Sequence, residues 1–159
     1  MNKPPRIRWD TRIPPDVNAR RHLPQLVADY FAQGRALLAN HPQPAELHAL
    51  RLATKRLRYT LELFRPCYGP GLSTRIAALR ELQQLLGEIN DTTAAARTLH
   101  AVMNGNSPER ARIDGFLRRQ GEAKAARFYK QWREVFDAPG QEQWWTSYLA
   151  RRSRQPEKR

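Results

Sequence analysis

Apolar residues recur along most of the chain at intervals of three and four, the spacing that gathers side chains on one side of an α-helix. Prolines and glycines divide this pattern into segments. The alternating β-branched runs typical of strands are absent from the sequence. The pattern therefore predicts an all-α protein, an antiparallel helical bundle of five to six helices joined by short turns. The expected helices span residues 23–39, 44–65, 72–87, 92–103 and 108–137, followed by a short helix around Trp144 and Trp145.

Individual residues mark the expected helix ends. We expect Pro24 in the first turn of the first helix, and Gly87 at the end of the third, where a left-handed residue is favoured. Asp91 is expected to act structurally, either by capping the fourth helix or by pairing with a buried arginine. The predicted organisation is a basic irregular arm over residues 1–21, a bundle over 22–150 and a basic tail over 151–159.

The chain is strongly basic, since 28 Lys and Arg oppose 15 Asp and Glu and give a formal net charge of +13. Such a charge attracts polyanions: nucleic acid, anionic lipid or a phosphate polymer. No apolar run is long enough to span a bilayer, and the N-terminus has no secretory signal. The single cysteine, Cys67, excludes an intramolecular disulfide and a cysteine-rich zinc site. We therefore expect a cytoplasmic protein that has no membrane partner, metal or cofactor.

The helix expected over residues 44–65 carries cations along one face. At 100° per residue its apolar side chains form a stripe made of Leu50, Ala53, Leu57, Leu61 and Phe64. On the opposite side lie His48, Arg51, Lys55 and Arg58. Neighbouring like charges on a helix repel one another, so this face is costly unless an anion neutralises it.

Other residues lie around this cationic face. Glu62 is its only acid and is expected to pair with Arg58, four residues earlier. Tyr59 and Leu52 are expected to form a half-buried border, and Arg56 lies off to the side. On other helices Arg80, Lys124 and Arg127 are further candidate cations, and we expect Arg80 and Gln83 to face a groove between helices. A run of charges on a helix is in general most often just a solvated surface.

Two motifs resemble those of CHAD domains. The first is Leu47-His48-x-x-Arg51-x-x-x-Lys55-Arg56-Leu57-Arg58-Tyr59, and the second is Leu82-Gln83-x-x-Leu86-Gly87-x-x-Asn90-Asp91. A less specific stretch from Gly115 to Arg133 is similar to the closing helix of the family. The resemblance covers residues 22–138. It implies an all-α domain that binds inorganic polyphosphate through a basic surface and that in bacteria associates with polyphosphate granules.

The resemblance also implies roles for single residues. His48, Arg51, Lys55, Arg56 and Arg58 match the basic positions of the first motif. A full CHAD domain contains two copies of the helical unit, whereas this chain has room for about one. Either the unit stands alone, or two chains pair as a two-fold homodimer that restores the double unit.

Three functions remain open from the sequence. The first, which we favour, is non-catalytic binding of inorganic polyphosphate, tighter at lower pH as His48 becomes charged. The second is nucleic-acid binding, which the basic termini favour, although the cationic face lacks the exposed aromatics of single-strand binders and nucleic acid would bind only nonspecifically. The third is a phosphate-related enzyme or a phosphoacceptor that uses His48. No metal-ligand spacing, phosphate loop, nucleophile elbow or acid–base pair supports it, so we expect no catalytic residue.

Overall fold

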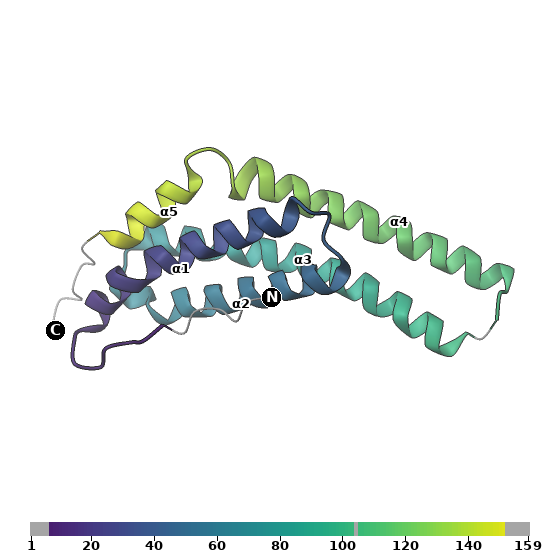
Figure 1. The fold of residues 1–159 in the computed structure, drawn as a ribbon, viewed down its shortest axis with the longest axis horizontal. Coiled ribbons are helices and arrows are strands. Elements are labelled where there is room, and N and C mark those ends of the chain that lie inside the picture. The colour runs from purple at the N-terminus through teal and green to yellow at the C-terminus, as the bar shows by residue number, and fades with distance from the viewer. Residues whose placement is uncertain (1–6, 104, 152–159) are drawn as a thin grey trace.

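The computed structural model describes residues 7–103 and 105–151, which form helices and connecting turns (Figure 1). The elements are α1 (Pro15–Leu38), α2 (Pro44–Leu63), a 3-10 turn η1 (Arg65–Cys67), α3 (Pro70–Val102), α4 (Pro108–Gln131), a π-helical turn η2 (Trp132–Phe136) and α5 (Gln141–Ala150). No strand occurs in this part of the chain. The predicted all-α helical bundle is confirmed.

The helices pack around one core. α3 lies between α2 and α4, while α1 packs against α2 and α5 (Figure 1). The centre of the core is aromatic: Phe31 stacks on Phe136 with their ring centroids 4.7 Å apart, and Trp132 lies 5.0 Å from Phe136. Gly34 lies directly against the indole of Trp132, in space that a Cβ atom would fill. The wheel analysis of α2 holds, because Leu50, Leu57, Leu61 and Phe64 are buried and Ala53 is partly buried against this core.

The C-terminal half of α3 and the N-terminal half of α4 project beyond the other helices as a two-helix hairpin (Figure 1). The last buried residue of α3 is Thr92, and the buried residue of α4 is Phe128, near its C-terminal end. Apolar side chains between them are exposed, namely Val102, Ile113 and Phe116. This end of the molecule therefore presents an apolar surface that α1, α2 and α5 do not cover.

The prediction that the chain breaks between residues 87 and 92 is wrong, because α3 continues through this segment. Gly87 does not end a helix, and Asp91 neither caps one nor pairs with a buried arginine: its side chain is exposed, with no ion pair to the described residues. Local propensity favours a break here, but Ile89 is buried in the core and Asn90 bonds to α2. Packing on both sides of α3 outweighs the weak helix formers.

The start of the first helix is also mispredicted. α1 begins at Pro15 rather than at residue 23, so residues 15–21 are helical instead of irregular and Pro24 lies inside the helix. Pro15 suits the first turn, where its missing N–H is not needed. Asn18 fixes the preceding chain, because its Nδ2 donates to the backbone oxygen of Asp10 at 2.8 Å and its Oδ1 accepts from the Asp10 backbone N–H at 3.0 Å.

Arg75 attaches α5 to α3. Its side chain is almost fully buried, and its guanidinium lies between the rings of Trp144, at 3.4 Å from the centroid, and Tyr148, at 3.9 Å. It donates to the backbone oxygens of Gly71 and Trp144. No acid among the described residues pairs with it, and burial lowers the pKa of the guanidinium to about 10. The Trp144–Trp145 end is thus part of the packing of the bundle.

Candidate functional site

The cations of α2 lie along the seam between α2 and α3. His48, Arg51, Lys55 and Arg58 follow one another at intervals of three and four residues, so they run along one side of α2 for about 15 Å at 1.5 Å per residue. The opposite side of α2 is buried in the core, so these side chains lie on the side that faces α3 and solvent. We call these four side chains the cation row.

The N-terminal half of the cation row faces neutral groups on α3. Nδ1 of His48 lies 2.8 Å from Oδ1 of Asn90, and since this oxygen accepts, Nδ1 carries the proton. Arg51 lies against Gly87, where a Cβ atom would be 3.6 Å from Nε of Arg51. This Nε is buried and has no hydrogen-bond partner among the described residues. Gly87, which was expected to end a helix, instead lies beside the cation row together with Asn90.

Lys55 is the least engaged member of the row. It makes no hydrogen bond or ion pair with the described residues, and its Nζ lies 5.7 Å from the centroid of the Tyr59 ring. The guanidinium of Arg58 lies 4.4 Å from the same centroid. Tyr59 is 48% exposed and Leu52 is 38% exposed, so both lie on a partly exposed border of the row. The ring of Tyr59 is half-exposed to solvent beside two cations.

The C-terminal end of the cation row is neutralised within the protein. Nη1 of Arg58 donates to Oε1 of Glu62 at 2.7 Å, which confirms the predicted pair, and Nε of Arg58 donates to Oε1 of Gln83 at 3.0 Å. Nη2 of Arg80, on α3, donates to the same oxygen of Glu62 at 3.2 Å. Arg80 and Gln83 therefore both face α2, as expected. Among the described residues, the acid that pairs with the row, Glu62, lies at one end of it.

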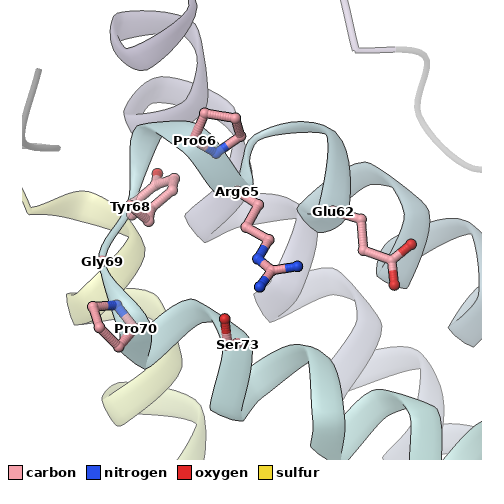
Figure 2. A pocket seen from close by; sticks show the side chains of 7 residues that line it. All are labelled: Glu62, Arg65, Pro66, Tyr68, Gly69, Pro70 and Ser73. Carbon is pink, nitrogen blue, oxygen red and sulfur yellow. The ribbon is translucent and has the colours of Figure 1, made fainter. Parts of the chain in front are cut away.

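A pocket lies beyond Glu62, where α2 turns into α3 (Figure 2). Figure 2 shows the side chain of Arg65 extending toward Ser73 in the first turn of α3, with Glu62 on the neighbouring turn of α2. Arg65 was not predicted, although it continues the spacing of the row three residues after Glu62. Pro66, which ends the helical pattern, obscures that continuation. The remaining lining residues are Pro66, Tyr68, Gly69 and Pro70.

Other predicted cations lie away from the row. Nζ of Lys124 donates to Thr92 at 3.1 Å, and Arg127 lies 3.5 Å from a carboxylate oxygen of Glu88. On α3, Thr92 and Glu88 are about 140–180° around the helix from Gln83 at 100° per residue. Lys124 and Arg127 therefore lie on the α4 side of α3. Arg56 is exposed on α2 and bonds to a backbone oxygen of its own helix.

Within residues 7–103 and 105–151, no three His, Cys, Asp or Glu side chains come together in a way that could hold a metal ion. Among the same residues, no helix combines the length and the apolar composition needed to span a bilayer.

Comparison with known proteins yields one match. A family model described as CHAD domain matches residues 4–100, which include all of α1 and α2 and most of α3. The cation row and its partners on α3 fall inside the matched region. No curated protein and no solved structure matches the chain.

Proposed function

The chain belongs to the CHAD family, and from that premise we propose that it is a non-catalytic module that binds inorganic polyphosphate along the cation row. CHAD domains are associated with polyphosphate-related proteins. The observation that carries the proposal is the neutrality of α3 beside the first half of the row, where Asn90 and Gly87 lie against His48 and Arg51. Among the described residues, the one member of the row with an acid partner is Arg58, which pairs with Glu62. A linear polyanion supplies the missing negative charge.

The side chains of the row suit different parts of such a ligand. The guanidinium groups of Arg51 and Arg58 can donate two parallel hydrogen bonds to phosphate oxygens, whereas Lys55 offers a compact charge. Nδ1 of His48 is engaged by Asn90, so Nε2 donates to an anion only when the imidazole is protonated. A protein that binds this polymer would collect at polyphosphate granules.

The dependence of binding on salt tests the proposal. If each of the four cations neutralises one phosphate, the logarithm of the affinity should fall against the logarithm of the salt concentration with a slope of about −3. Titration calorimetry with long-chain polyphosphate at several salt concentrations measures that slope. An affinity independent of salt would contradict binding through the row.

Competition distinguishes polyphosphate from nucleic acid. The exposed ring of Tyr59, beside Lys55 and Arg58, favours the nucleic-acid alternative more than the sequence indicated, because an exposed aromatic can stack a base. Single-stranded DNA or RNA at equal phosphate concentration should nevertheless leave bound polyphosphate in place. Displacement under these conditions would refute the specific proposal.

We further infer that a second copy of the chain covers the exposed hairpin. Two hairpins can approach without strong repulsion, because residues 91–122 carry five arginines and four acids, a net charge of +1 within a chain of +13. Contact would also remove the apolar side chains of Val102, Ile113 and Phe116 from water. The charged residues are Arg97, Arg110, Arg112, Arg118 and Arg119 against Asp91, Glu109, Asp114 and Glu122.

Substitution of Phe116→Asp should convert the dimer to a monomer, because it introduces a charge into the apolar contact. Light scattering at tens of micromolar should give twice the mass of one chain for the wild type and that of one chain for the variant. Val135→Asp is the matched control, since Val135 is equally exposed, at 53%, but lies outside the hairpin. A monomeric wild type would refute the dimer and leave the polyphosphate proposal untouched.

A further inference from the structure

One carboxylate oxygen joins two guanidinium groups from two helices. Oε1 of Glu62 accepts from Arg58 on α2 at 2.7 Å and from Arg80 on α3 at 3.2 Å. The Arg58 side chain is 11% exposed, that of Glu62 30% and that of Arg80 65%, so the cluster opens toward solvent on the side of Arg80. Two donors converging on one anionic oxygen are also what a phosphate group requires. Glu62 thus occupies a position suited to a phosphate oxygen.

Glu62 also interrupts an otherwise continuous line of cations. The acid-free part of the row, from His48 to Lys55, spans about 10 Å at 1.5 Å per residue, whereas the line continued to Arg65 spans about 25 Å. Between Lys55 and Arg65 lie Glu62 and the two arginines with which it pairs, Arg58 and Arg80. Beyond them is the pocket that contains Arg65 and Ser73 (Figure 2). A short anion fits the acid-free part alone, but a longer one meets the carboxylate.

We propose that Glu62 is a displaceable counter-charge, and that long polyphosphate displaces it to reach Arg58, Arg80 and Arg65. This inference rests on the proposed function. A polymer that already occupies His48 to Lys55 presents its next phosphates to Arg58 at high effective concentration. The Arg80–Glu62 pair is open to solvent, and Arg58 keeps its hydrogen bond to Gln83 when Glu62 leaves, so the exchange of Glu62 for a phosphate is favourable. Glu62 is therefore a residue that sets the preference for chain length.

Glu62→Gln tests the inference with two ligands, tripolyphosphate and long-chain polyphosphate. The substitution should tighten binding of the long chain roughly three- to tenfold, since an exposed competing ion pair is removed. Binding of tripolyphosphate should stay within about twofold of wild type. The glutamine keeps an acceptor oxygen for Arg58, and circular dichroism verifies the fold.

Two further variants make the outcome decisive. Glu81→Gln removes the same charge from an exposed position of α3 that has no hydrogen bond or ion pair within the described chain, and it should change neither ligand's affinity. Arg80→Gln should weaken only the long chain, and it tests the inference independently of how Glu62→Gln folds. The inference would be overturned if Glu62→Gln bound the long chain more weakly than the wild type, or if it tightened binding of both ligands equally. Binding of polyphosphate by the wild type would still support the proposed function in either case. A wild type that binds neither ligand would overturn both.

Discussion

Replacing Arg51, Lys55 and Arg58 together by alanine is expected to lower the affinity for long polyphosphate by about 10²- to 10³-fold. Hydrogen bonds to charged groups contribute about 1.5 kcal/mol each at the low end of their range, so three lost contacts to one ligand account for at most about 10³-fold. The salt slope should become less steep by about 2, because three cations no longer neutralise phosphates. Calorimetry across salt concentrations measures both quantities on the same samples.

A control variant that loses the same number of charges distinguishes binding to the cation row from attraction by the net charge of the chain. Arg21, Arg119 and Arg133 are exposed on α1, α4 and η2, away from the row. Their combined replacement by alanine removes the same three charges and should weaken binding by less than about tenfold, the part due to long-range attraction. Equal losses in the two triple variants would mean that the ligand binds to the overall charge and not to the row. Circular dichroism should show the same helix content in both.

The helical class and α2 could be predicted from the sequence because both follow from local periodicity. The spacing of Leu50, Leu57 and Leu61 defines the buried side of α2, and the structure buries all three. The continuity of α3 could not be predicted in this way. Asn90 favours a helix end locally, but its bond to His48 exists only once α2 lies beside α3. Tertiary contacts decide where propensity is weak.

The alignment of the cations could also be predicted, but the groups facing them could not. A helical wheel shows that Arg58 and Glu62 share a face, whereas the register of α2 against α3 determines that Arg80 shares the same carboxylate. The packing of α4 against the other side of α3 separates Lys124 and Arg127 from the row, which their number in the composition does not reveal. Periodicity orders residues within one helix, and packing between helices determines the rest of the site.

Trp132→Ala should lower the free energy of unfolding by about 3–5 kcal/mol, the usual loss when a large aromatic side chain is removed from a core. Trp132 is 2% exposed and lies against Tyr30, Phe31 and Phe136. A loss of that size corresponds to a fall in melting temperature of about 6–20 °C for a domain of this length.

Urea unfolding followed by circular dichroism measures the loss, with Val135→Ala as the control. Val135 lies in the same π-helical turn but is half-exposed, so its truncation should cost less than about 0.5 kcal/mol. The fraction of Trp132→Ala that remains folded should bind polyphosphate like the wild type, because the cation row on α2 does not contact this part of the core. A loss below about 1 kcal/mol would contradict the packing of α1 against η2, and a loss of affinity in the folded fraction would show that the row depends on it.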